Sequence, residues 1–248
     1  MRETPLISQA RCVRIIPAGT NTVRPRSSKG AETKAKILRT AADLFHERGV
    51  GATSPDDIIK ASKTGKGQFY HYFKSKERLV HEVLQSYLHA IKSGAAPVNY
   101  EISSWRDLEA WFFAHVELQK SFGMKRGCPF GTIGNEVREG DELIRQDLSL
   151  IFEVVKTKLA AFFIREKAKS RLSKDANEGQ LADFCIASVQ GAMLMGKIRH
   201  SPETVESTVS QALAYLKTFA VDGADGPGAA DQMAKSERPK PPRPRSRR

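Results

Sequence analysis

Apolar residues recur at helical spacing throughout residues 31–221, and this periodicity limits the fold more than any other feature of the sequence. In residues 32–48, for example, Ile37, Leu44 and Phe45 fall on one face of a helix. No stretch shows the alternation of apolar and polar residues that is typical of a half-buried strand. The sequence therefore predicts an all-α protein.

Start and stop signals set the expected helices. Thr53 or Ser54 caps a helix that has Pro55 in its first turn and two aspartates near its positive end. Ser75 caps another helix, and Ser201 followed by proline opens the last one. The expected helices cover residues 32–48, 55–62, 66–72, 76–91, 103–122, 141–169, 177–199 and 202–220.

Positive charge is concentrated at the two ends and in the first folded segment. The net charge is +12, and residues 1–30 hold six basic groups against one acidic group. Residues 235–248 hold seven against one, and residues 31–78 hold ten against six. A polyanion is therefore expected to meet these parts of the chain. Residues 79–234 carry a small negative balance.

Several classes of protein are disfavoured by what the sequence contains. No apolar run approaches the about 18 residues that cross a bilayer, so no membrane is expected as a partner. The three cysteines show no C-x-x-C spacing, which argues against a disulfide framework and a zinc site and favours the cytoplasm. No paired carboxylates, nucleophile motif or phosphate loop indicates an enzyme, and we expect no cofactor and no metal. Residues 1–30 are expected to form a disordered basic arm, with a transit peptide as the alternative.

The stretch "KTGKGQFYHYFKSK", residues 63–76, follows the short helix at 55–62 after a tight turn. Two short helices joined in this way are typical of the helix-turn-helix, whose second helix enters the major groove of DNA. Lys66 and Gln68 offer the groups that pair with guanine and adenine edges. The predicted DNA contacts are Thr53, Ser54, Thr64, Lys66, Gly67, Gln68, Tyr70, His71, Tyr72 and Lys76.

A plainer interpretation of this stretch is a solvated, lysine-rich surface. Phe69 and Phe73 fit that interpretation in part, because their four-residue spacing predicts that both pack inward. The glycine-framed run from Lys66 to Tyr72 fits it poorly, which favours DNA binding.

At these residues the chain resembles the TetR family of transcriptional regulators, and the match spans about residues 33–88. The family pattern is close to KGxxYxxFxSKExL, which corresponds here to Lys66, Gly67, Tyr70, Phe73, Ser75, Lys76, Glu77 and Leu79. The resemblance implies a two-domain, all-helical homodimer that binds operator DNA and is released by a small ligand. Two positions depart from it: Lys63 replaces the usual glycine of the turn, and Gly65 replaces the usual serine or threonine cap.

The expected domains follow from these observations. Residues 31–78 form a helix-turn-helix domain and residues 79–221 a helical domain for ligand binding and dimerisation, while residues 222–248 form a disordered basic tail. The segment "GCPFGTIGNEV", at 127–137, resembles one found in a subgroup of the family.

In the second domain, aromatic residues are candidates to line a cavity for an apolar effector, although core packing is the alternative for each. The predicted cavity residues are Trp105, Trp111, Phe112, Phe122, Cys128 and Phe130. Cys128 lies near Lys125 and Arg126, so a redox-sensing thiolate is an alternative to an inert buried cysteine.

Stripes on the last two helices predict a dimer interface in the form of a four-helix bundle, with internal core as the alternative. They consist of Phe184, Ser188, Gly191, Met195, Val205, Val209, Ala212 and Leu216. The function expected from the whole sequence is a transcriptional regulator, a repressor released from a palindromic operator by a small molecule. The alternative is a non-specific architectural DNA-binding protein.

Overall fold

The computed structural model describes residues 29–221. The regular elements in this range are helices, α1 to α9, and one isolated bridge pairs Leu172 with Ala220. The predicted all-α fold is thereby confirmed. The predicted basic tail, and all but the last two residues of the predicted arm, lie outside the described residues. Lys29 and Gly30 belong to the first turn of α1.

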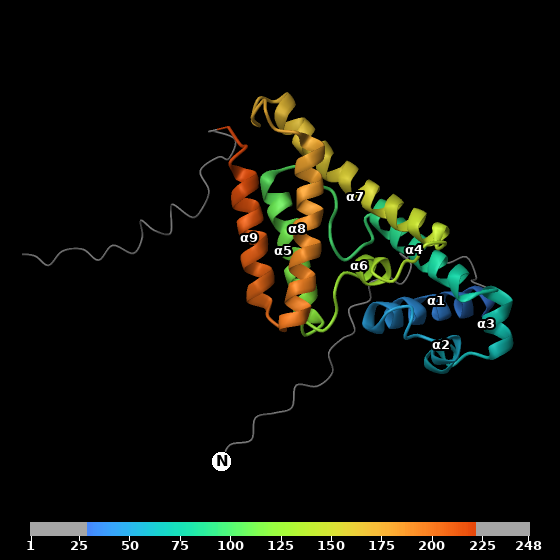
Figure 1. Cartoon of the computed structure of the whole chain (residues 1–248). Coiled ribbons are helices and arrows are strands. Elements are labelled where there is room, and N and C mark those ends of the chain that lie inside the picture. Colours follow the sequence, from blue (N-terminus) through green and yellow to red (C-terminus); the bar gives the residue numbers. More distant parts are fainter. Residues whose placement is uncertain (1–28, 222–248) are drawn as a thin grey trace, which may run out of the picture.

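The first three helices, α1 (Lys29–Arg48), α2 (Pro55–Ser62) and α3 (Lys66–Tyr72), form a small unit at one end of the molecule (Figure 1). Their boundaries agree closely with those expected from the sequence. Ile37, Phe45 and Ile58 are fully buried between them. Gly49 ends α1 at a φ of +88°, a left-handed conformation that favours glycine.

The fourth helix, α4 (Lys76–Lys92), leads from this unit into the larger part of the molecule and packs against α7 (Glu142–Ala168). Ser75 caps α4, because its Oγ accepts a hydrogen bond from the backbone N of Arg78 at 3.1 Å. The α4–α7 contact includes a nearly buried carboxylate, Asp147. It lies 2.6 Å from Nδ1 of His81 and accepts a 2.7 Å hydrogen bond from Gln85.

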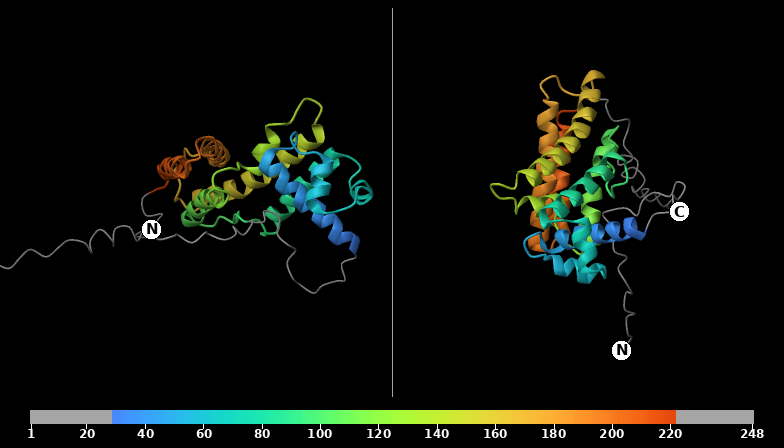
Figure 2. Two further views of the ribbon diagram at one scale, coloured as in Figure 1. Left: turned by 90° about the horizontal axis from the view of Figure 1, so that it is seen from below. Right: turned by 90° about the vertical axis from the view of Figure 1, so that its right-hand side faces the viewer.

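Three helices stand side by side at the other end: α5 (Trp105–Ser121), α8 (Glu178–Arg199) and α9 (Pro202–Lys217) (Figures 1 and 2). Among the described helices, α8 is long and apolar enough, by length and composition alone, to cross a membrane. Its residues Cys185, Val189 and Met193 are buried, and it packs against α7 and α9. The same composition is typical of a core helix in a globular domain.

The short helix α6 (Pro129–Gly134) was not expected from the sequence, which has glycines at 127, 131 and 134. Proline in the first turn starts the helix, since its missing N–H has no intrahelical partner there. α6 lies between α1 and α7 and contacts both (Figure 1). It therefore connects the small N-terminal unit with the interior of the larger one.

Candidate nucleic-acid interface and buried cavity

The start of α2 is fixed by local hydrogen bonds. Oγ of Ser54 accepts from the backbone N of Asp57 at 3.1 Å, and the Asp57 carboxylate accepts from the backbone N of Ser54 at 2.9 Å. The Ser54 hydroxyl also donates a 2.7 Å hydrogen bond to the Asp57 carboxylate, and this bond, together with the one from the Ser54 backbone N, lowers the pKa of Asp57. After α2, Lys63 adopts a left-handed conformation with φ of 52°, at the position where the family usually has glycine. The chain then turns directly into α3.

Helix α3 begins directly after Gly65, which has no side chain to cap it. Gln68 supplies part of the missing cap, because its Oε1 accepts a 3.0 Å hydrogen bond from the backbone N of Gly65. Phe69 and Phe73 are 0% and 1% exposed, which confirms that they pack inward. They fix the rotation of α3 about its axis.

Opposite these two rings, α3 presents a polar face to solvent. Tyr70 is 45% exposed, and Lys66, Gln68 and His71 are also exposed. Lys66 has only a 3.9 Å contact with Asp56, and 70% of its side chain is accessible. A Cβ atom added at Gly67 would have no neighbouring atom within 4 Å. Five of the predicted contact residues thus lie on one solvent-facing surface, which we call the α3 outer face: Lys66, Gly67, Gln68, Tyr70 and His71.

Other predicted contact residues lie elsewhere. Thr53 is fully buried, and its hydroxyl donates a 2.7 Å hydrogen bond to the carbonyl of Gly49, so its selection as a surface contact was wrong. The Thr64 hydroxyl is half-buried and lies 2.8 Å from Oγ of Ser62. Tyr72 and Lys76 are half-buried beside the outer face, and Ser54 is exposed while it caps α2.

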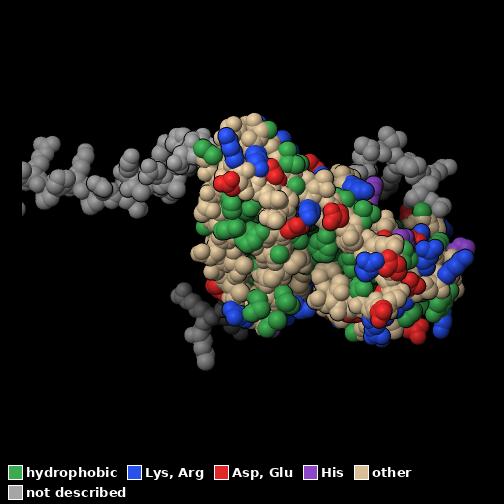
Figure 3. Space-filling model, turned by 45° about the horizontal axis from the view of Figure 1, so that its top comes forward, with side chains coloured by type: hydrophobic (Ala, Val, Ile, Leu, Met, Phe, Trp, Pro, Cys, Tyr) green, Lys and Arg blue, Asp and Glu red, His purple; other side chains and the backbone are tan. Residues whose placement is uncertain are grey.

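Basic residues that the sequence did not single out lie next to the outer face. Lys74 and Arg78 are exposed and border a polar depression together with Tyr72 and His81. Lys34 borders it too, but pairs with Glu82 at 2.7 Å. Blue and purple side chains in Figure 3 mark this end of the molecule. Lys74 and Arg78 lie four positions apart around the start of α4, whereas Lys34 comes from α1, far away in the chain.

The segment before α6 binds α1 directly. Arg126 is 15% exposed and donates hydrogen bonds to the carboxylates of Asp43 at 2.6 Å and Glu47 at 3.2 Å. Nε2 of the buried His46 lies 2.7 Å from the carbonyl oxygen of Gly127. Burial lowers the pKa of His46 to about 4, so the ring is neutral near pH 7 and donates through Nε2. The segment after α6 also contacts the turn that follows α1, since the Glu136 carboxylate accepts a hydrogen bond from the backbone N of Gly51.

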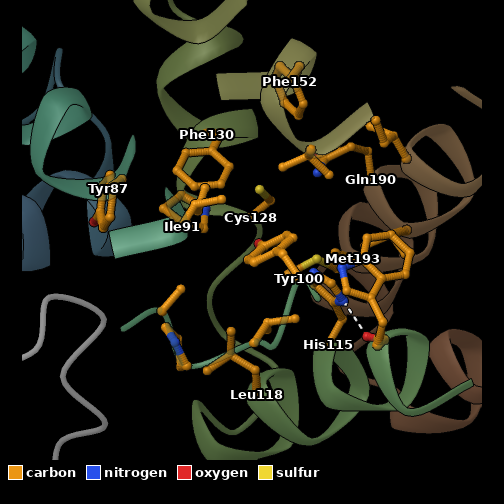
Figure 4. Close-up of a pocket in the computed structure, with 18 of the residues that line it drawn as sticks. Tyr87, Ile91, Tyr100, His115, Leu118, Cys128, Phe130, Phe152, Gln190 and Met193 are labelled. Carbon is orange, nitrogen blue, oxygen red and sulfur yellow. Dashed lines mark hydrogen bonds between the residues drawn. The ribbon is translucent and has the colours of Figure 1, made fainter. Parts of the chain in front are cut away.

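On the other side of the same segment lies a mainly apolar, partly open cavity of about 60 Å³. Residues from five helices and the loop after α4 converge on it (Figure 4). Several residues that line the cavity were not selected from the sequence. Their side chains are aromatic, polar or sulfur-containing: Tyr87, Tyr100, His115, Phe152, Gln190 and Met193.

The predicted cavity residues divide into two groups. Trp111, Cys128 and Phe130 line the cavity, whereas Trp105, Phe112 and Phe122 do not. Trp105 packs edge-on against Phe162 at 5.3 Å, and Phe112 is fully buried in the core. Phe122 lies edge-on to His46, with ring centroids 5.1 Å apart. Helical spacing identified apolar faces but not which neighbour each face meets.

Cys128 lies between the cavity and α1 but lacks the surroundings of a reactive thiolate. Burial raises the pKa of its thiol, and hydrogen bonds from the backbone of Gly131 and from Gln190 offset only part of this effect. The nearby Arg126 directs its guanidinium to α1 instead. These observations favour the inert alternative for Cys128.

The predicted dimer stripe on α9 faces inward. Val205, Val209, Ala212 and Leu216 are 0–4% exposed within the single chain, so the internal-core alternative holds for them. Gly191 is exposed and Met195 is 37% exposed on α8, while Phe184 and Ser188 are half-buried. The large exposed apolar residues near them are Leu194, Ile198 and Tyr215. Figure 3 shows hydrophobic side chains gathered over this end of the molecule.

Two family models match the chain. The model for bacterial regulatory proteins of the tetR family matches residues 37–83, and the tetracyclin repressor-like C-terminal domain matches residues 105–212. The HTH-type transcriptional repressor DhaR of Mycobacterium sp. (strain GP1) is 28% identical over 172 residues, which cover 68% of this chain and 85% of DhaR. The transcriptional regulator AcuR of Cereibacter sphaeroides is 25% identical over 195 residues, which cover 77% of this chain and 89% of AcuR.

Solved structures share the fold. A cysteine mutant of the TetR family regulator CifR, in a structure with 26-base-pair operator DNA, superposes with a TM-score of 0.61 at 24% identity over 77% of this chain and 98% of that one. The fold and the α3 outer face define a helix-turn-helix regulator that binds DNA with sequence specificity. The chain belongs to the TetR family of bacterial regulatory proteins.

Proposed function

We propose that this protein is a dimeric repressor in which the α3 outer face reads each half of a palindromic operator. The observation that carries the proposal is the division of α3 into an anchored side and a free side. Phe69 and Phe73 hold the helix, while the Lys66, Gln68 and His71 side chains are exposed and carry donors and acceptors that suit base edges.

Phosphate contacts would surround these base contacts. Tyr70 on the outer face, and Tyr72 and Lys76 beside it, carry a hydroxyl or a cation, and Ser54 lies at the start of α2. Lys74, just before α4, and Arg78, in its first turn, extend the basic surface. Contacts of this kind position a protein on the duplex without reading sequence.

Dimerisation would use the exposed sides of α8 and α9. Gly191, Leu194, Met195, Ile198 and Tyr215 form an apolar surface there, which a second copy of the chain would cover. Gly191 has open space around its Cβ position, so a partner helix can approach closely. The α3 helix lies at the opposite end of the subunit, which leaves both DNA-reading ends of a dimer free (Figure 1).

Release by an effector would begin in the cavity. Its volume of about 60 Å³ is smaller than the roughly 150 Å³ that holds a benzene ring in an engineered cavity, so a ring-sized ligand must push the walls apart. One wall is Cys128, Pro129 and Phe130, which directly follow the Arg126 and Gly127 groups that bind α1. Movement of this wall would shift α1 and the attached α3 helix. We place this activity in the cytoplasm, where operator DNA and the effector meet.

A footprint on DNA selected from random fragments tests the proposed function. A dimeric repressor protects a short palindrome with half-sites about one helical turn apart. Uniform protection along the fragment would instead support the architectural alternative and would contradict the proposal.

A further inference from the structure

The cavity described above contains no charged group. Its lining, as far as the described residues form it, includes no aspartate, glutamate, lysine or arginine. Burial raises the pKa of Tyr87 and Tyr100, so both phenols remain neutral at physiological pH. An ionised ligand would lose its hydration without gaining a counter-charge, which is costly. The chemistry of the walls therefore selects an uncharged molecule.

One side chain of the lining offers an acceptor that the protein does not use. Nδ1 of His115 lies 2.8 Å from the carbonyl oxygen of Trp111, one turn earlier in α5. Burial lowers the pKa of His115 to about 4, and the hydrogen bond offsets only part of that effect, so the ring is neutral. A carbonyl oxygen only accepts, so Nδ1 carries the proton and Nε2 is left as an acceptor. No described residue donates a hydrogen bond to Nε2.

A neighbouring side chain offers an unused donor. Nε1 of Trp111 is buried and has no hydrogen-bond partner among the described residues, although Trp111 is only 3% exposed. The Trp111 and His115 rings lie edge to face with centroids 4.7 Å apart, and both line the cavity. A buried indole N–H and a buried imidazole nitrogen each gain free energy when a ligand supplies the missing partner. Figure 4 shows His115 with Leu118, Tyr100 and Met193 around the cavity.

We propose that the cavity binds a small, uncharged, mainly apolar molecule whose hydroxyl group donates a hydrogen bond to Nε2 of His115. A hydroxyl brings one proton to donate, which matches the free acceptor of His115. The remaining walls are apolar or aromatic and suit a short alkyl or ring body. The role of this molecule as the effector rests on the function proposed above.

Three ring compounds of similar size separate the requirements: phenol donates a proton, anisole only accepts, and benzoate is charged. Binding is followed on the full chain by NMR, through the shift of the Met193 methyl group, which lines the cavity. Phenol should bind about tenfold more tightly than anisole, the difference expected for one good hydrogen bond. Benzoate should leave the Met193 signal unchanged at millimolar concentration.

Substitutions assign the preference to one side chain. His115→Leu should reduce the phenol preference to less than about twofold, because the acceptor is gone. His115→Gln, which keeps an acceptor, should retain part of it. The control His89→Leu removes an exposed histidine of α4 and should change nothing.

Any one of four results would overturn the proposal. These are strong benzoate binding, equal affinity for phenol and anisole, an unchanged preference in His115→Leu, and a Met193 signal that none of the three compounds shifts. The test is independent of DNA. If phenol binds at Met193 but leaves the operator complex intact, the effector-release part of the proposed function fails while the cavity proposal stands.

Discussion

Replacement of Gly49 by alanine should disturb the junction between the N-terminal unit and the rest of the molecule. Gly49 has a φ of +88°, which an alanine adopts only with strain. A Cβ at this position would lie 1.9 Å from Oε1 of Glu136. The carboxylate must therefore move, and it then loses its hydrogen bond to the backbone N of Gly51.

Two contributions set the size of the effect. The left-handed conformation costs about 1–2 kcal/mol for a residue with a Cβ. The displaced carboxylate adds about 1 kcal/mol, the usual net value of a hydrogen bond at a site that water reaches. Gly49→Ala should thus lower the free energy of unfolding by about 2–3 kcal/mol. Gly140→Ala is a matched control, because Gly140 has a φ of +98° and nothing within 4 Å of its Cβ position. It should cost about 1–2 kcal/mol.

Urea unfolding followed by circular dichroism measures both variants. A double-mutant cycle with Glu136→Ala then isolates the contact, since Gly49→Ala on that background should cost no more than Gly140→Ala. The contact with Glu136 contributes nothing if the two glycine variants lose equal stability, or if removal of Glu136 leaves the cost of Gly49→Ala unchanged.

Three further predictions concern stability and assembly. Lys63→Gly should raise the free energy of unfolding by about 1 kcal/mol, because Lys63 is held at a φ of 52°, and an unchanged Tm would contradict this. Neutral His46 and His115 have pKa values lowered to about 4 from 6.5, so the unfolded chain binds more protons between these values. The free energy of unfolding should be greatest above pH 6.5 and fall as the pH drops towards 4, by at most about 3 kcal/mol for each histidine. Urea unfolding at several pH values measures this loss, and a free energy of unfolding that does not change with pH would show that the rings are protonated in the folded state. Gly191→Trp should keep the helical content but separate the dimer in sedimentation, and a dimer that persists at micromolar protein would place the interface elsewhere.

Local signals in the sequence predicted most of the fold. Ser54, Ser75 and Ser201 each cap the helix that follows them, and the ends of α3 lie where glycine and the aromatic pattern indicated. The spacing of Phe69 and Phe73 predicted that both side chains pack inward, and both are buried. Such features depend on neighbours within one or two turns, which a single sequence contains.

Features that depend on distant neighbours were not predicted. Helix α6 is held between α1 and α7 in a glycine-rich segment that gave no helical signal. Thr53 was read as a surface hydroxyl, but the fold of the α1–α2 turn buries it against Gly49. The α9 stripe was correctly apolar, yet the sequence did not distinguish a partner subunit from α5 and α8 of the same chain. No local pattern in the sequence marked His115 as a cavity residue, because its cavity forms from five helices.

A comparison of the DNA fragments retained by Lys66→Ala with those retained by Arg78→Ala tests whether the α3 outer face reads DNA sequence. Both side chains are exposed, so neither change should disturb the fold. Lys66→Ala should lose about 1–3 kcal/mol on the operator and relax the preference at one base position in each half-site. Arg78→Ala should weaken binding to all sequences alike. Equal weakening of operator and random DNA by Lys66→Ala, with base preferences unchanged, would contradict the account.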